Sequence, residues 1–347
     1  NFTINIKTKN PQILLEGRNL RINDIQTNVA LKSLINNQFL IDDLQITTKE
    51  IKLDDLISLV RIFQNSQQLF ILNTIIKDGY VVADINLNFD ETGKIKENYK
   101  IRGSVQKVKL NILNKFKSKN LNFNFDIDKS IYSLKRVDME LNNIKISSPL
   151  IKITKKKNSF LVNGQLLNDK KNFTIEELKP IFANLLHDAN IQKIEFSSKN
   201  NFSFNVNKNL KFNNFKVESI VDLDKLILNE KHLKIKSYFP SFVEDIKLEE
   251  HKIFIKYNKN KLDIKGSGNI LLEDKSDTLS YQLVKDNINF SFDSKINLKN
   301  NSLLIDFLDY EKKEGLNSLI SIKGSFVENK QLRFDLINLI ENNNEIS

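Results

Sequence analysis

Apolar and polar residues alternate along much of this chain. Over residues 81–89, every second position is apolar: Val81, Ala83, Ile85, Leu87 and Phe89. Side chains on a β-strand point alternately to opposite faces, so such a segment has one apolar face and one more polar face. A helix does not separate the two kinds of residue at this spacing. The segment is therefore predicted to be a half-buried strand.

The same alternation recurs further along the chain and also near its start. Three later segments carry the apolar sets Leu121, Phe123, Phe125 and Ile127; Phe202, Phe204 and Val206; and Ile288, Phe290 and Phe292. Turn residues between the strands are predicted at 78–79, 91–93, 156–158, 168–170, 258–260 and 300–301. Strands follow one another without the long crossovers that parallel pairing needs, which favours an antiparallel meander.

Two stretches have the spacing of a helix instead. The first lies near residues 54–65, where Asp54 and Asp55 precede an apolar run and place negative charge at a helix N-terminus. The second lies near residues 174–189, where Thr174 and Glu177 form a capping-box pattern. Phe173, just before the cap, is expected to pack on Leu178.

These patterns together predict an all-β fold, an elongated, mainly antiparallel curved sheet (a β-groove) with two short accessory helices. A single core rarely serves 347 residues. We therefore expect two segments, 1–170 with the helix near 54–65, and 171–347, opening with the helix near 174–189. Alternation alone leaves open whether the apolar faces line an open groove or close on each other as a dry sandwich.

The net charge of +10 comes almost wholly from Lys, and Asn makes up about one residue in seven. Arg, the residue that nucleic-acid readers use for bidentate contacts, occurs only at positions 18, 21, 61, 102, 136 and 333. We therefore expect no nucleic-acid partner. The basic triplet Lys155-Lys156-Lys157 is interpreted as a solvated hairpin tip, with contact to an anionic lipid as the alternative.

Searches for catalytic and metal-binding patterns favour a chain without catalytic residues, metal or cofactor. It contains no Cys and three His, and it lacks a phosphate-binding G-x-x-x-x-G-K-[ST] loop. The sequence Gly266-Ser267-Gly268 does not match a nucleophile elbow, and we expect a bulge or a close backbone approach there. No apolar run is long enough to span a membrane as a helix.

Several stretches resemble the AsmA-like family (YhdP/TamB-type envelope proteins). The run 28–46 ends in an I-x-x-L-x-I strand, Ile41 to Ile46, and is continued by Ile51-Lys52-Leu53. Residues 79–105 are similar to a recurring G-x-hydrophobic, F-D-x-x-G-x-I and Y-x-I-x-G-x-V pattern of the YhdP type. Residues 308–313 and 322–326 also resemble that branch, so the similarity covers most of the chain in short pieces.

The resemblance implies a periplasmic part of a Gram-negative envelope protein that an N-terminal helix, not present in this chain, tethers to the inner membrane. Since the chain begins with Asn1 rather than Met, we expect it to be a fragment. Regions outside it would reach the inner and outer membranes. The implied role is non-enzymatic: phospholipid acyl chains would move along an apolar groove for outer-membrane lipid transport or maintenance, lined by the alternating residues named above.

Two other functions stay open from the residues alone. A structural or adhesive secreted β-sandwich would bury the same apolar faces in a dry core. A carbohydrate hydrolase on a β scaffold would need two acids facing one cleft, with aromatic platforms for the sugar. The absence of Trp disfavours this second alternative.

Overall fold

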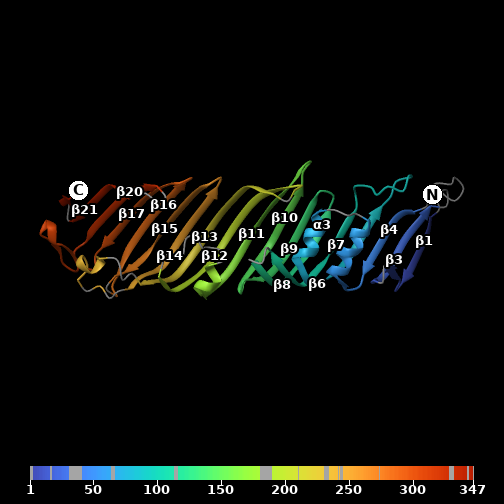
Figure 1. Cartoon of the computed structure of the whole chain (residues 1–347), viewed down its shortest axis with the longest axis horizontal. Coiled ribbons are helices and arrows are strands. Elements are labelled where there is room, and N and C mark those ends of the chain that lie inside the picture. Colours follow the sequence, from blue (N-terminus) through green and yellow to red (C-terminus); the bar gives the residue numbers. More distant parts are fainter. Residues whose placement is uncertain are drawn as a thin grey trace. The chain divides into compact units, whose positions relative to one another are not determined.

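The computed structural model of the chain describes residues 3–15, 18–30, 41–63, 67–112, 116–179, 190–209, 211–229, 234–240, 242, 245–272, 274–327, 332–341 and 344–346. Strands account for 75% of the residues and helices for 9%, and the strands pair antiparallel. The predicted all-β, antiparallel class is therefore confirmed (Figure 1).

Two compact units make up the chain. The first comprises Asn1–Leu166 and Phe204–Asn213, and the second comprises Leu167–Ser203 and Asn214–Ser347. Three strands contribute residues to both units: β11 (Ser159–Phe173), β12 (Ile191–Asn207) and β13 (Phe212–Asn229). The domain division proposed at residues 170 and 171 stays a prediction.

The first unit is an antiparallel meander. Its strands are β1 (Thr3–Lys9), β2 (Gln12–Leu15), β3 (Arg18–Ala30), β4 (Ile41–Thr48), β5 (Ile51–Lys52), β6 (Ile76–Asn88), β7 (Lys100–Ile112), β8 (Phe116–Asp128), β9 (Ile131–Leu141) and β10 (Ile144–Lys155). β1 and β2 both pair with β3, which is followed in space by β4 and then by β6 through β10 in order. Residues 31–40 of the AsmA-like motif lie outside the described residues.

Two helices join β5 to β6. Helix α2 (Leu53–Phe63) carries Asp54 and Asp55 in its first turn, which confirms the helix predicted near 54–65. Helix α3 (Gln67–Ile75) was not predicted. Its apolar residues do not keep to one stripe: Phe70 and Leu72 are 57% and 45% exposed. The helical period that reveals α2 is therefore missing from α3.

A short helix also begins where the capping box predicted it. Residues 175–179 are helical. The Glu177 N–H donates to Thr174 Oγ1 (3.2 Å), and the Thr174 N–H donates to Glu177 Oε2 (3.0 Å). Burial opposes ionisation of Glu177, but hydrogen bonds from Lys171 and the Thr174 N–H hold its pKa below its usual value. Phe173 and Leu178 are both buried, as a hydrophobic staple requires. The rest of the predicted helix, residues 180–189, lies outside the described residues.

The second unit is also a meander. Its further strands are β14 (Asp245–Asn258), β15 (Lys261–Leu271), β16 (Ser276–Asp286), β17 (Asn289–Leu298), β18 (Leu303–Ile305), β19 (Tyr310–Lys312), β20 (Ser318–Val327), β21 (Arg333–Glu341) and β22 (Asn344–Ile346), with short 3₁₀ turns η1 (Lys234–Ser237) and η2 (Asp306–Leu308). The spatial order is β13, β14, β15, β16, β17, β20, β21 and β22, and β18 and β19 form a separate hairpin.

Two predicted turns lie inside strands instead. Asp78 and Gly79 form a bulge in β6, where the register with β7 shifts and Gly79 has a φ of 137°. Residues 168–170, expected to break the chain, continue β11. Their polar side chains bond to other parts of the second unit: Asn168 to Ser198, and Lys170 to Asp224. The polar residues that suggested a turn therefore lie in a strand, where their side chains form hydrogen bonds.

A line of bulges crosses the middle strands of the first unit. Lys107, Asn120 and Arg136 have φ values of 54°, 52° and 53° and lie where the β7–β8 and β8–β9 registers shift. The Asn122 side chain supports two of them, because it accepts from the Lys107 N–H (2.9 Å) and donates to the Asn120 carbonyl (2.7 Å). Bulges bend strands, so this line divides each strand into two differently directed halves.

Candidate functional site

Register aligns the apolar residues of the first unit into rows that cross the strands. Directly paired residues share a face of the sheet. One row runs through β3, β4, β6, β7, β8, β9 and β10 as Ile25, Ile46, Ile85, Ile101, Ile127, Tyr132 and Ile153. All seven side chains are half-buried. We call this set the open row.

The candidate residues of β6 and β8 lie on the same face as the open row. Ile85 and Ile127 belong to the row itself. Val81 and Phe123 are both in register with Val105, whereas Ala83 and Phe125 are both in register with Gly103. Leu87 pairs with Leu44, and Phe89 makes an isolated bridge to Ile95. The structure therefore brings these predicted positions together on one side of the sheet.

Helix α2 covers one end of this face. Ile51, Val81, Val105 and Val108 form a buried cluster, with Leu53, Leu56, Leu121, Phe123 and Phe125 among the residues packed against it. The described helices pack mainly on β3, β5, β6 and β7. For Val81, Leu121 and Phe123, packing in a core is therefore the immediate role. The open row lies nearer the other ends of these strands, beyond Ala83 and Gly103.

The second unit repeats the pattern of aligned rows. One row joins Ser219, Ile255, Ile264, Leu283, Phe292, Gly324 and Phe334, and another joins Val217, Tyr257, Leu262, Lys285, Phe290 and Phe326. The rings of Phe290 and Phe326 stack with centroids 4.4 Å apart. The predicted residues Phe290 and Phe292 therefore lie on an apolar face, and their side chains are half-buried.

The four remaining predicted residues lie in β12 or beside β17. Ile288 was expected to continue the face of Phe290, but it lies in the turn before β17 and is 56% exposed. The turn uses Asn287 at a φ of 55°, which interrupts the alternation. Phe202, Phe204 and Val206 are half-buried residues of β12. Phe202 belongs to the second unit, whereas Phe204 and Val206 belong to the first.

Glycines make room for aromatic rings on both apolar faces. A Cβ on Gly103 would lie 2.7 Å from the Phe125 ring, and one on Gly324 would lie 2.5 Å from the Phe292 ring. The Tyr281 ring lies over Gly266 in the same way. A Cβ on Gly268 would lie 2.6 Å from the His251 Cα, which confirms the close backbone approach predicted for Gly266-Ser267-Gly268. Each ring therefore lies across the neighbouring strand rather than standing up from it. The sequence signal was the isolated strand glycine.

One end of the apolar face in the second unit is also covered, but by inserted segments. Phe242, Ile270 and Leu272 form one buried cluster with Phe239 packed against it. The β18–β19 hairpin supplies Leu303, Ile305 and Tyr310 to a second cluster with Leu298 and Leu339. The Leu304 N–H donates to the Tyr238 carbonyl (2.9 Å), which ties the two inserted segments together.

A buried lysine anchors the β18–β19 hairpin. Lys312 is fully buried, and its ammonium donates to the carbonyls of Asn301 (2.6 Å), Lys299 (3.3 Å) and Lys313 (3.3 Å). Asn301, also fully buried, donates through Nδ2 to Asp277 Oδ2 (2.7 Å). Because burial of a charge is costly unless it is well bonded, this cluster fixes the hairpin in one place. Sequence reasoning missed it, since a single Lys among many carries no distinguishing signal.

His251 is the one histidine that the structure describes, and it is buried beside Gly268. Its Nε2 lies 2.9 Å from the Asn269 carbonyl, so Nε2 carries the proton and Nδ1 is left as a buried acceptor without a partner among the described residues. Burial lowers the pKa of His251, against the opposing effect of the Asn269 carbonyl. A neutral ring that packs against glycine fits a structural role.

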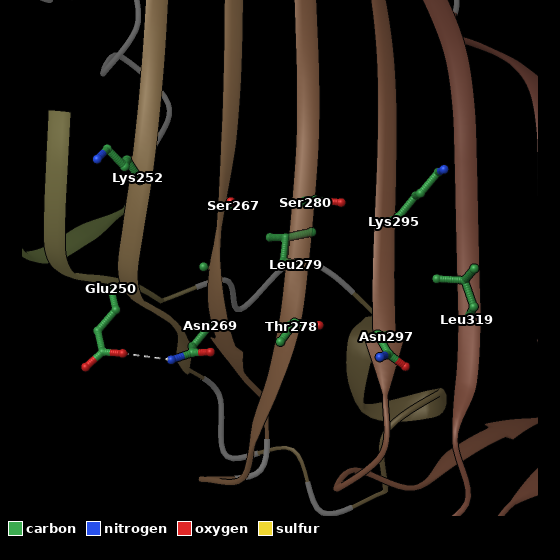
Figure 2. A pocket seen from close by; sticks show the side chains of 11 residues that line it. Glu250, Lys252, Ser267, Asn269, Thr278, Leu279, Ser280, Lys295, Asn297 and Leu319 are labelled. Carbon is green, nitrogen blue, oxygen red and sulfur yellow. Dashed lines mark hydrogen bonds between the residues drawn. The ribbon is translucent and has the colours of Figure 1, made fainter. Parts of the chain in front are cut away.

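The opposite faces of the sheets are polar. In the first unit, Asn5 donates to Asn28 (2.8 Å) and Asn28 to Asp43 (2.7 Å), an amide ladder across three strands. In the second unit, a shallow depression of about 570 Å³ has a floor of Ser267, Thr278 and Ser280. Figure 2 shows Lys252 and Lys295 on either side of that floor, and Glu250 accepting from Asn269 (3.2 Å).

The depression lacks the acid pair that a glycosidase needs. Of its described lining residues, Glu250 alone carries a carboxylate, whereas hydrolysis uses two. In the described residues, no cluster of three or more His, Asp or Glu side chains is arranged to hold a metal ion. Among the helices that the structure describes, none combines the length and apolar composition needed to cross a membrane.

Comparisons with known proteins add no assignment. No family model matches the chain, and neither a curated protein nor a solved structure is significantly similar to it. The AsmA-like resemblance therefore stays a prediction.

Proposed function

We propose that the chain is a non-enzymatic lipid-binding segment that holds phospholipid acyl chains on the apolar faces of its sheets. The AsmA-like resemblance places this activity in the periplasm, in transport or maintenance of outer-membrane lipids. The observation that carries the proposal is the open row, seven aligned apolar side chains that remain partly exposed.

The physical argument is the cost of leaving such a face in water. Removing apolar surface from water is favourable by about 25 cal/mol per Å². In the first unit, the helices that the structure describes relieve this cost near Val81 and Val105. An acyl chain laid across the open row would cover the remaining side chains, while its head group stays in water. Contacts of this kind are non-directional, so they hold a chain without fixing it at one position.

The ion pairs of the polar face also favour binding of the lipid on the apolar face. Asp126 lies between Arg102 (3.6 Å) and Lys135 (3.5 Å), so charged side chains there form ion pairs with one another. Ligand binding to that face would have to displace water and break these pairs. The apolar face offers no such competition.

Lipid extraction and native mass spectrometry of the full chain, expressed in a Gram-negative periplasm, test the proposal. The test variant carries Ile101→Asp and Ile127→Asp, two changes in the open row. The matched control carries Asn86→Asp and Asn124→Asp, which add the same charge to exposed positions of the polar face on β6 and β8. We expect several phospholipids per chain in the wild type and in the control, and a loss of most of them in the test variant.

Circular dichroism confirms that each variant folds, and Ile101→Ala with Ile127→Ala serves if the aspartates disturb the sheet. A folded wild-type chain without bound lipid, which also takes up no labelled phospholipid, would contradict the proposal and favour a structural or adhesive role. Equal lipid content in the test and control variants would also contradict it.

A further inference from the structure

In the first unit, the β8–β9 and β10–β11 turns lie at the edge of the sheet opposite α2. The Tyr99 hydroxyl donates to the Lys129 carbonyl (3.0 Å), and the Lys155 N–H donates to the Ser130 carbonyl (2.7 Å). The β8–β9 and β10–β11 turns are therefore neighbours. The open row crosses the sheet just inside this edge, since Ile127 and Tyr132 are the paired residues nearest the β8–β9 turn on that face.

The β10–β11 turn extends the apolar face into a cationic rim. Lys155 is the last residue of β10, two residues after Ile153 of the open row. Residues two apart on a strand share a face, so Ile151, Ile153 and Lys155 follow one another on the apolar side. The Tyr132 and Phe160 rings meet edge to face beside them, with centroids 6.4 Å apart. Along β10, the aromatic and aliphatic surface is therefore followed directly by the ammonium group of Lys155.

The charge at this rim is not balanced locally. Lys155, Lys156 and Lys157 are all exposed, and none of them forms an ion pair with any residue that the structure describes. The nearby carboxylate of Asp128 follows Ile127 by one residue and so belongs to the polar face, where it is in register with Lys100. Three cations thus remain available at the end of the apolar face.

We propose that the Lys155-Lys156-Lys157 turn binds the headgroup of an anionic phospholipid whose acyl chains lie on the open row. This inference rests on the proposed lipid-binding function and adds the headgroup class to it. An acyl chain beside a phosphate matches the order of surfaces along β10, apolar at Ile151 and Ile153 and basic at Lys155. A net negative headgroup is attracted by all three ammonium groups, whereas a zwitterionic one carries a compensating cation.

The β16–β17 turn of the second unit does not offer the same surface. It places Asp286 beside Lys285, and the Lys285 ammonium lies 4.6 Å from the centroid of the Phe290 ring. That cation is already engaged with an aromatic face. The β16–β17 turn is therefore not assigned a headgroup preference.

Uptake of fluorescent phosphatidylglycerol and phosphatidylcholine by the full chain tests the inference. The test variant is Lys155→Gln, Lys156→Gln and Lys157→Gln. The control is Lys119→Gln, Lys145→Gln and Lys152→Gln, which removes the same charge from exposed positions of the same unit. At low salt we expect the wild type and the control to prefer phosphatidylglycerol about fivefold, and the test variant to lose that preference while it keeps phosphatidylcholine uptake.

Each outcome has a distinct meaning. The headgroup assignment would be overturned if the test variant kept the preference for phosphatidylglycerol, or if the wild type showed no such preference. Acyl-chain binding would remain intact in both cases. Failure of the wild type to take up either lipid would overturn the proposed function itself. Loss of the preference in inorganic phosphate, but not in sodium chloride of the same ionic strength, would assign the turn to a free anion and overturn the lipid headgroup. A fall of the preference with rising salt supports it, because exposed charges are screened.

Discussion

The two units cover their apolar faces by different means. In the first, α2 lays aliphatic side chains such as Leu53 and Leu56 on a cluster of valines. In the second, the β18–β19 hairpin and the Phe239–Phe242 segment lie on the sheet, and a buried ammonium group anchors the hairpin. An aliphatic cover gains stability from many small contacts, whereas the hairpin combines its apolar contacts with one buried charged group. The second cover should therefore be the easier one to break with a single substitution.

The largest expected effect comes from Lys312→Ala. The change removes the donor from three carbonyl oxygens in a site that excludes water, and leaves a cavity as well. We expect a loss of about 4 kcal/mol in the unfolding free energy of the second unit. Urea unfolding followed by far-ultraviolet circular dichroism measures the loss. The neighbouring exposed change Lys313→Ala is the control and should cost less than about 0.5 kcal/mol.

A smaller effect is expected from Ile57→Ala in α2. Ile57 is 7% exposed, and truncation of a buried isoleucine to alanine costs about 3 kcal/mol. Hydrogen exchange resolves the two units, and faster exchange should appear in β5 and β6 but not in the second unit. Leu72→Ala in α3, where the side chain is 45% exposed, provides the control. If Leu72→Ala lowered the unfolding free energy as much as Ile57→Ala, the proposed division between covered and open parts of the face would be contradicted.

The smallest effect is a pH dependence of the second unit, which contains His251, the one histidine that the structure describes. Burial lowers the pKa of His251 below its ordinary value of 6.5. As the pH falls through that value, the unfolded chain binds a proton that the folded chain does not, so the unfolding free energy decreases. Unfolding at pH 7.5 and 5.5 should show this decrease in the wild type, and His251→Gln should reduce it. An equal decrease in both proteins would assign it to other groups.

Alternation carried most of the fold prediction because its physical cause is local. A period of two determines which side chains share a face, and this was sufficient for β6, β8 and β17. The Thr174 and Glu177 capping-box pattern was also placed correctly, since both of its hydrogen bonds lie within four residues. These features depend on neighbours in the chain, so sequence reasoning reaches them.

Features that depend on distant partners were not predictable in the same way. The open row exists only because the registers of six strand pairs agree, and no single segment encodes that agreement. Alternation also failed at Ile288, where a two-residue turn interrupts it. The burial of Lys312 depends on carbonyl groups at Lys299 and Asn301, which the chain approaches only when β18 and β19 fold back.

The connections of the second unit have a consequence for how such a chain lengthens in evolution. The β14–β15 and β16–β17 connections, at one edge, have two residues each, whereas the Phe239–Phe242 segment and the β18–β19 hairpin enter at the other edge. A duplicated hairpin would therefore add two strands, about 10 Å of sheet, without displacing either covering segment. In-frame duplication of some two dozen codons would be enough to enlarge the apolar surface, so the length of the sheet and the design of its cover can be selected separately.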